Sequence, residues 1–208
     1  MSIASRLATA QERRDQDLNI ALAEQISTSR NASDVAELLA LAQTGARPQK
    51  YDAIKVLYEV GRRAPDLIAP HLEAFIDLVA VKDSRMIWGA MTAIAMIAPA
   101  RTKSVFAHLD QILRAAERGS VIAKDQAIAI FVALMSDKGM EDEIAPVLLD
   151  QIRFAAINQL PMYAEMAMPV MIKKYARELN TVLTTRLAES MPDSKRRRVE
   201  KVVKALSV

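Results

Sequence analysis

Four stretches of the sequence repeat one apolar pattern at a fixed spacing, and they decide the fold. Residues 53–60, 90–97, 127–134 and 164–171 read, in that order, AIKVLYEV, AMTAIAMI, AIAIFVAL and AEMAMPVM. Each stretch begins with an alanine that follows the previous one by 37 residues. In the first stretch the apolar residues fall at i, i+3, i+4 and i+7, which is the spacing of one face of an α-helix. Repetition at this period predicts a stack of similar helical units.

A second apolar column follows the first in each repeat. His71-Leu72 recurs as His108-Leu109, and residues 109–112 recur as residues 149–152, a few residues later than the period requires. We therefore expect an insertion in the polar segment 136–143. The expected architecture is five antiparallel helix pairs, at 10–45, 48–83, 84–119, 120–158 and 159–190, followed by a C-terminal capping helix at 192–206.

The composition agrees with an all-α fold. Of the 208 residues, 51% are hydrophobic and only 4% aromatic, and there are five glycines. Abundant Ala, Leu, Ile and Met favour helices over a sheet sandwich. One helix pair cannot bury enough apolar surface to fold alone, whereas stacked pairs share a continuous core. We predict one α-solenoid domain over residues 1–208, a superhelical stack with a period of 37 residues.

The repeats resemble HEAT repeats. The resemblance rests on residues 53–57 with Pro65, on Pro70-His71-Leu72 with Asp77, and on residues 90–98. A basic residue three positions before the first alanine is typical of the family. Lys50 and Lys124 fit this pattern, whereas Ile87 and Pro161 depart from it. The resemblance covers most of residues 48–158 and implies a HEAT/armadillo-like solenoid, a fold that mostly serves as a binding scaffold.

Signatures of common catalytic and cofactor sites are missing from the sequence. It contains no phosphate-binding glycine loop, nucleophile elbow or zinc-protease motif, and no cysteine, so we expect neither cofactor nor metal. The longest uncharged stretch, residues 86–100, is too short for a membrane span. We expect a cytoplasmic protein that does not span a membrane.

A few side chains admit a functional reading beside a structural one. His71 and His108 could be metal ligands, but no third ligand is evident, so we interpret them as packing residues at helix starts. Glu165 replaces an apolar residue of the repeat; a buried carboxylate could act as an acid or base, whereas an open end of the stack would leave it in water. Trp88 and the methionines around Met166 could serve a partner, but they fit core packing better.

The C-terminal helix carries the clearest charge feature. Residues 195–204 hold six basic residues and one acidic residue in a chain whose net charge is +3, so the rest of the chain is net acidic. The interval between apolar residues predicts an amphipathic helix that caps the stack. Its basic face is a solvated cap surface or a patch for an acidic partner. The candidate binding residues are Lys195, Arg196, Arg197, Arg198, Lys201 and Lys204.

The absence of a catalytic motif favours a non-enzymatic scaffold that binds a protein partner on a concave face made by the second helices. Charges of both signs on those helices suit a protein better than a phosphate backbone. These charged residues are Asp66, Glu73, Asp77, Lys103, Asp110, Arg114, Arg118, Asp150 and Arg153. The alternatives are nucleic-acid binding through residues 195–204 and, by resemblance to HEAT-like base-excision glycosylases, a repair enzyme in which Glu165 would be the only candidate acid.

Overall fold

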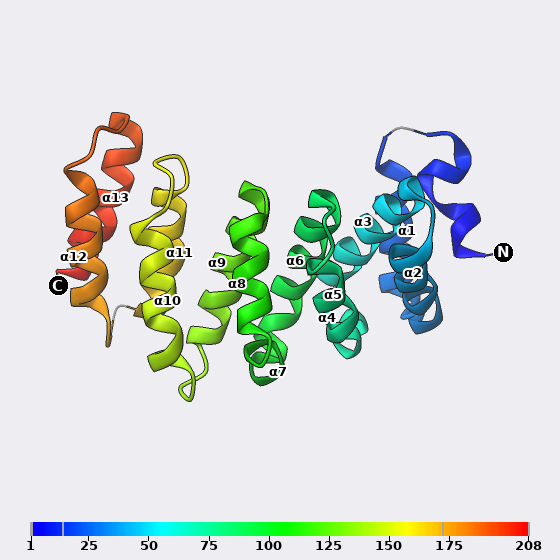
Figure 1. Ribbon diagram of the computed structural model, residues 1–208, viewed down its shortest axis with the longest axis horizontal. Helices are drawn as coiled ribbons and strands as arrows, with labels where there is room; N and C mark the ends of the chain where they lie inside the picture. The colour runs from blue at the N-terminus through cyan, green and yellow to red at the C-terminus, as the bar shows by residue number, and fades with distance from the viewer. Residues whose placement is uncertain (1, 14, 172, 208) are drawn as a thin grey trace. The chain divides into compact units, whose positions relative to one another are not determined.

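The computed structural model describes residues 2–13, 15–171 and 173–207, and every regular element within them is helical (Figure 1). The prediction of an all-α chain is therefore confirmed. The chain divides into two compact units, Met1–Ala127 and Ile128–Val208. The prediction of one domain over the whole length stays a prediction.

The first unit begins with two short 3-10 helices, η1 (Ile3–Arg6) and η2 (Ala8–Gln11), which the sequence analysis does not anticipate. Three helix pairs follow. Their elements are α1 (Asp17–Ser29), α2 (Ala32–Thr44), α3 (Arg47–Arg63), α4 (Pro65–Ile68), η3 (Ala69–His71), α5 (Leu72–Val79), α6 (Ser84–Ile97), η4 (Ala98–Ala100), α7 (Thr102–Phe106) and α8 (Leu109–Arg118). Helix α9 (Val121–Met135) starts in this unit and ends in the second.

The second unit contains the rest of α9 and four further helices. They are α10 (Glu141–Arg153), α11 (Leu160–Met171), α12 (Ala176–Leu187) and α13 (Asp193–Leu206). The expected insertion lies between α9 and α10, in a turn segment that contains Gly139.

Helices α3, α6 and α13 each pack against both helices of the pair before them. In the first unit α3 packs on α1 and α2, and α6 packs on α3 and α5. In the second unit α13 packs in the same way on α11 and α12. The C-terminal helix therefore occupies the place that the first helix of a further repeat would take.

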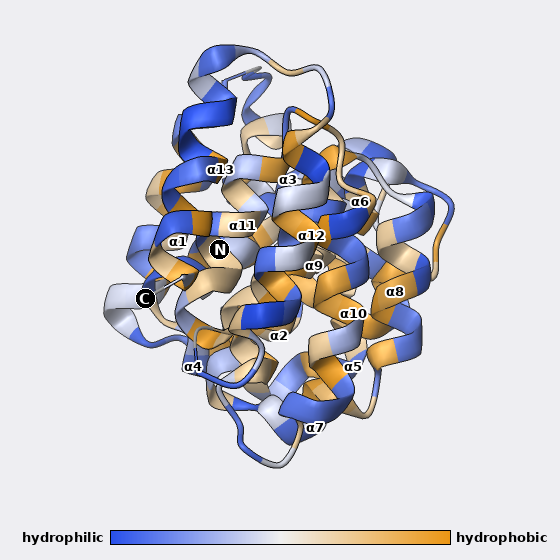
Figure 2. Cartoon of the chain, turned by 90° about the vertical axis from the view of Figure 1, so that its left-hand side faces the viewer, coloured by the Kyte–Doolittle hydropathy of each residue, from blue (hydrophilic) through white to orange (hydrophobic). Residues whose placement is uncertain are grey.

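The repeat columns form the core. Ala53, Ala90, Ala127 and Ala164 are all fully buried. Leu57, Ile94 and Phe131, one helical turn further on, are also fully buried. Apolar and polar residues alternate in short bands along the helices, as the amphipathic pattern requires (Figure 2).

The second helices of the two middle repeats are shorter than expected. The sequence predicts one continuous second helix in each, but α4, η3 and α5 replace it in one repeat, and α7 and α8 in the next. The breaks come at His71 and His108, which directly precede α5 and α8. Pro70 lies just before the first break and has no N–H to donate to a continuous helix.

Several helix ends are closed by arginine side chains from elsewhere in the chain. Arg118 donates to the carbonyl of Val79 at the end of α5 (3.3 Å). Arg196 donates to the carbonyls of Leu187 (2.6 Å) and Glu189 (3.1 Å) at the end of α12. These carbonyls have no partner within their own helix, so each arginine ties one element to the end of another.

Among the described residues, no helix combines the length and the hydropathy that crossing a bilayer would require. The cytoplasmic location stays a prediction of the sequence.

Candidate interaction surfaces

The histidines and the acidic run do not form a metal site in the described part of the chain. His108 pairs with Glu73, with 2.8 Å between its Nε2 and the Oε1 of the glutamate. No group of three or more histidine, cysteine, aspartate or glutamate side chains is placed to hold a metal ion among the described residues. Glu141–Glu143 occupy the first turn of α10, where acidic side chains stabilise the positive end of the helix.

Glu165 is exposed and paired with a residue of the C-terminal helix. Arg198 donates to both of its carboxylate oxygens, from Nε at 2.8 Å and from Nη2 at 2.6 Å. These hydrogen bonds hold the pKa of Glu165 below its ordinary value. A general acid at neutral pH needs a raised pKa, so Glu165 does not meet that requirement. The reading that leaves Glu165 in water is correct, but the end of the stack is not open there, because α13 packs on α11 and supplies a polar partner.

The aromatic and methionine candidates are parts of the packing. Trp88 is half-buried, and its ring centroid lies 5.5 Å from that of Tyr58 at an interplanar angle of 51°. Lys55 lies over the Tyr58 ring at 4.8 Å. Met166 is half-buried and Met171 is fully buried.

The six basic residues of α13 fall into two groups of three. Lys195 donates to the side chain of Asn158, Arg196 caps α12, and Arg198 pairs with Glu165. These three residues are held by contacts that dock the helix. The N-terminal turns of α13, which carry them, are strongly hydrophilic (Figure 2).

The other three basic residues face solvent. Arg197, Lys201 and Lys204 are exposed, and their side chains make no hydrogen bond or ion pair with the described residues. Their spacing of four and then three residues places them on one stripe of the helix. Only this stripe of α13, named here the basic stripe, offers cations to a partner.

Three open pockets lie between successive second helices. The first, of about 270 Å³, lies between α2 and the end of α5 and is also lined by the starts of α3 and α6. The second, of about 280 Å³, lies between α5 and α8. Both belong to the first unit. The third, of about 310 Å³, lies between α10 and α12 in the second unit.

The pocket linings mix apolar and charged side chains. The first is lined by Ala42, Gln43, Gly45, Arg47, Lys50, Leu78, Val81, Asp83 and Met86. The second is lined by Val79, Ala80, Gln111, Arg114 and Arg118, and the third by Ala145, Pro146, Leu149, Asp150, Arg153, Tyr175 and Glu178.

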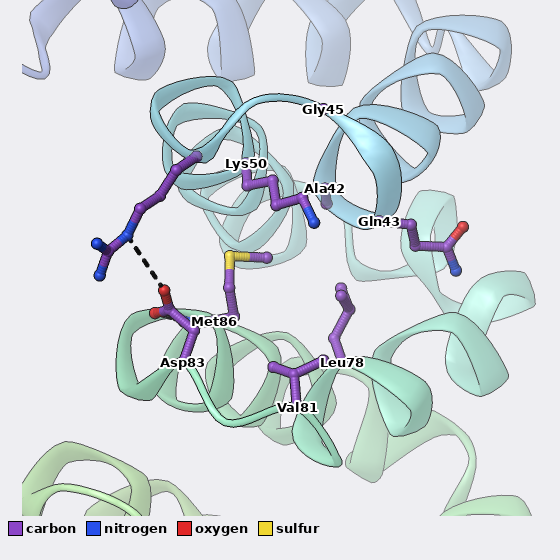
Figure 3. A pocket seen from close by; sticks show the side chains of 9 residues that line it. Ala42, Gln43, Gly45, Lys50, Leu78, Val81, Asp83 and Met86 are labelled. Atoms are coloured by element: carbon purple, nitrogen blue, oxygen red, sulfur yellow. Dashed lines mark hydrogen bonds and ion pairs between the residues drawn. The ribbon is translucent and has the colours of Figure 1, made fainter.

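Figure 3 shows the first pocket from close by. Lys50 comes from one wall, and Met86, Leu78 and Val81 come from the other and point toward the same gap. Asp83 closes one side with Arg47, whose Nε lies 3.6 Å from the carboxylate. From the sequence, Lys50 is predicted only as a marker of the repeat, and its place in a pocket was missed. The wall of this pocket is assembled from four helices, so no local pattern in the sequence reveals the pocket.

Solved structures share this fold at low sequence identity. A designed armadillo repeat protein in complex with the peptide (KR)4 matches with a TM-score of 0.69 and 14% identity, over 98% of each chain. A computationally designed armadillo repeat protein for modular peptide recognition matches with a TM-score of 0.68 and 13% identity, again over 98% of each. An archaeal HEAT-like repeats protein from Thermococcus onnurineus NA1 matches with a TM-score of 0.52 and 12% identity, over 92% of this chain and 95% of that one.

No protein-family model and no curated protein matches the sequence. The structural matches nevertheless extend over nearly the whole chain, and they join the 37-residue period to a known architecture. The predicted solenoid and the resemblance to HEAT repeats are both confirmed at the level of the fold. The chain is an all-α solenoid with the HEAT/armadillo-like repeat fold.

Proposed function

We propose that this chain is a non-enzymatic scaffold that binds an extended segment of a partner protein along its second helices. The observation that carries the proposal is the set of three pockets, each between two successive second helices and each of about 300 Å³. The two pockets of the first unit follow one another at the spacing of the helix pairs, which suits a chain that places successive side chains into them, and the second unit contains a pocket of the same kind.

The comparisons support this class of function. Two of the structural matches are designed proteins whose descriptions name peptide recognition or a bound peptide. A binding role also agrees with the state of Glu165, the one candidate acid, which is exposed and ion-paired. Partner binding needs no titrating residue, whereas acid–base catalysis does.

Nucleic-acid binding through α13 is the weaker reading. Half of its basic residues are already used to dock the helix, so a phosphate backbone would meet only the basic stripe. Binding to phosphates weakens steeply as salt rises, roughly in proportion to the number of contacts. Nucleic-acid binding would appear as retention of DNA or RNA that is lost as salt rises and is abolished by reversing the charges of Arg197, Lys201 and Lys204 together. We expect no such retention. Retention with that behaviour would favour this reading over ours.

The proposal is tested by selecting peptides from a random library displayed on phage and measuring their affinities by fluorescence anisotropy. Three substitutions fill the pockets with an indole: Gln43→Trp, Ala80→Trp and Glu178→Trp. We expect at least one of them to weaken each selected peptide about tenfold or more, since the bulky ring occludes the groove. Ala10→Trp adds the same ring at an exposed site outside the pockets and is the matched control.

Circular dichroism melts establish that each variant folds. Selected peptides whose affinities are the same for all three pocket-filling variants and for Ala10→Trp would overturn the proposal.

A further inference from the structure

The first pocket holds a cation without a partner beside an apolar wall. Lys50 is half-buried and lines the pocket, and its ammonium makes no hydrogen bond or ion pair with the described residues. A half-buried ammonium has lost part of its hydration and gains from an anion that enters the pocket.

The one carboxylate that lines the pocket is already engaged. Asp83 accepts hydrogen bonds from the Tyr51 hydroxyl (2.7 Å) and from the backbone N–H groups of Arg85 (2.9 Å) and Met86 (3.4 Å). Burial alone would raise the pKa of Asp83, but these hydrogen bonds outweigh it and hold the pKa below its ordinary value. Asp83 therefore caps α6 and pairs with Arg47, and it leaves Lys50 uncompensated.

The wall opposite Lys50 is apolar and partly open. Leu78 and Met86 are buried, whereas Val81 is 37% exposed and is one of the few large apolar side chains at the surface (Figure 3). A ligand that matches both walls carries an anionic group next to an apolar side chain.

The second pocket carries charge of the same sign. It is lined by Arg114 and Arg118 and by no acidic residue. Asp77, on the α5 segment between the two pockets, lines neither of them. Both pockets of the first unit therefore favour anions, which is the opposite of a surface suited to a basic peptide.

We propose that the second-helix face of the first unit binds an extended acidic segment of a partner protein, with a carboxylate of the segment on Lys50 and an adjacent apolar side chain against Leu78 and Val81. Further carboxylates of the same segment reach Arg114 and Arg118 in the second pocket. This inference rests on the proposed function and names the chemistry of the partner.

Three labelled peptides serve as probes. One repeats Glu-Leu-Ser-Gly, and the other two carry Lys or Gln in place of each Glu. Anisotropy with the full chain should show that the acidic peptide binds at least about tenfold more tightly than either counterpart, because only it can pair with Lys50.

Charge reversal identifies the residue. Lys50→Glu should weaken the acidic peptide about tenfold and strengthen the basic one. Lys124→Glu makes the same charge change at the equivalent position of another repeat, outside all three pockets, and should alter either affinity less than about twofold. Val81→Ser should weaken the acidic peptide about fivefold by removing apolar contact without changing charge. Lys50→Gln, which keeps most of the side chain, supplies the milder variant if the reversal affects folding.

Equal affinity for the acidic and basic peptides, no binding of the acidic peptide at millimolar concentration, or equal effects of Lys50→Glu and Lys124→Glu would each overturn the inference. Its failure is distinguishable from failure of the proposed function. Phage-selected peptides that lose affinity on Gln43→Trp but contain no acidic residue would leave the scaffold function standing and remove the acidic partner.

Discussion

At the scale of single residues, Arg186 shows how a cation can replace an apolar core residue. It lies on the face of α12 that buries Leu179, Val182 and Leu183, and it is only 7% exposed. Its guanidinium donates to the carbonyls of Ile152 (3.0 Å), Arg153 (2.6 Å) and Ala155 (2.7 Å). The arginine therefore satisfies the last turn of α10 from the neighbouring second helix.

Replacing Arg186 with methionine should destabilise the chain by about 3 kcal/mol, because the Arg153 and Ala155 carbonyls lose this donor, and the Ile152 carbonyl loses one of its donors, in a place with little water. Urea unfolding followed by circular dichroism measures the change. Arg177→Met, on the exposed face of the same helix, should change the free energy of unfolding by less than about 0.5 kcal/mol. Equal effects of the two substitutions would contradict this role.

Glu59 gives the fold a stability that depends on pH. Its side chain is 8% exposed and pairs with Lys55 (2.8 Å) and Arg63 (2.7 Å). Burial alone would raise the pKa of Glu59, but the hydrogen bonds from these two cations outweigh it, so the pKa lies below its ordinary value. A carboxyl group whose pKa is lower in the folded state than in the unfolded state stabilises the fold at pH values above its unfolded-state pKa. This stabilisation is lost as the pH falls through the folded-state pKa.

We expect Glu59→Gln to lower the free energy of unfolding at neutral pH. The gap in this free energy between the variant and the parent chain should narrow as pH falls from about 5 to about 3. Urea unfolding at a series of pH values measures the gap. Glu117→Gln, at an exposed site without an ion pair among the described residues, should keep a constant gap. A gap for Glu59→Gln that does not change with pH would show that the ion pairs contribute nothing.

At the scale of elements, the distance between neighbouring first helices is set by small residues. Helices α3 and α6 pack closely, and Gly89 of α6 faces Ile54 of α3. A Cβ on Gly89 would lie 2.6 Å from Cγ1 and 3.3 Å from Cγ2 of Ile54. The branched side chain of Ile54 is 1% exposed and has no room to move away.

Gly89→Ala should therefore destabilise the chain by about 1–2 kcal/mol, although alanine is the better helix former. Thermal melting or urea unfolding tests it. Gly139→Ala is the control, since a Cβ there meets nothing closer than Asp137 Oδ1 at 3.5 Å. A stabilised Gly89→Ala variant would mean that the two helices separate at no cost.

The same scale shows what the sequence could and could not predict. The alanine columns and the turn around Gly139 follow from periodicity and turn composition, and the structure has both. The breaks at His71 and His108 were missed because apolar spacing continues across them. Segment 3–11 was missed because it has no periodicity. It is held by the buried side chains of Ile3 and Leu7 and by polar contacts, such as the hydrogen bond from the Thr9 N–H to the Asp52 carboxylate (2.7 Å).

The pockets could not be predicted for a related reason. Helical spacing shows which side chains are buried, but Lys50 and Val81 are separated by a whole helix pair in the chain. The basic residues of α13 were found by composition alone. Composition cannot show that Arg196 and Arg198 are used inside the fold while Arg197 is free, because that depends on where the neighbouring helix ends.

At the scale of the whole molecule, a repeat fold is stabilised by contacts between neighbouring elements. Helix α13 contributes Val199 (fully buried), Val202 (3% exposed) and Leu206 (9% exposed) to its contact with α11 and α12. A weakened end should therefore affect its neighbours first, and the effect should fade with distance along the chain.

Val199→Ala should cost about 1–2 kcal/mol, and it should speed amide hydrogen exchange most in α11, α12 and α13 and least in α1–α3. Exchange followed by mass spectrometry measures the gradient. Val203→Ala, at a half-buried site on the same helix, should give a smaller change with the same distribution. Uniform acceleration over the chain would indicate unfolding as a single cooperative unit.

The placement of α13 also bears on how such a chain can grow. It packs on α11 and α12 in the way that α6 packs on α3 and α5, so it contacts the last pair as the first helix of a further repeat would. A duplicated helix pair inserted before residue 192 would offer α13 the same packing surface, provided that the copy keeps the residues that α13 contacts. Lengthening the array by whole periods would thus leave the contacts of α13 unchanged.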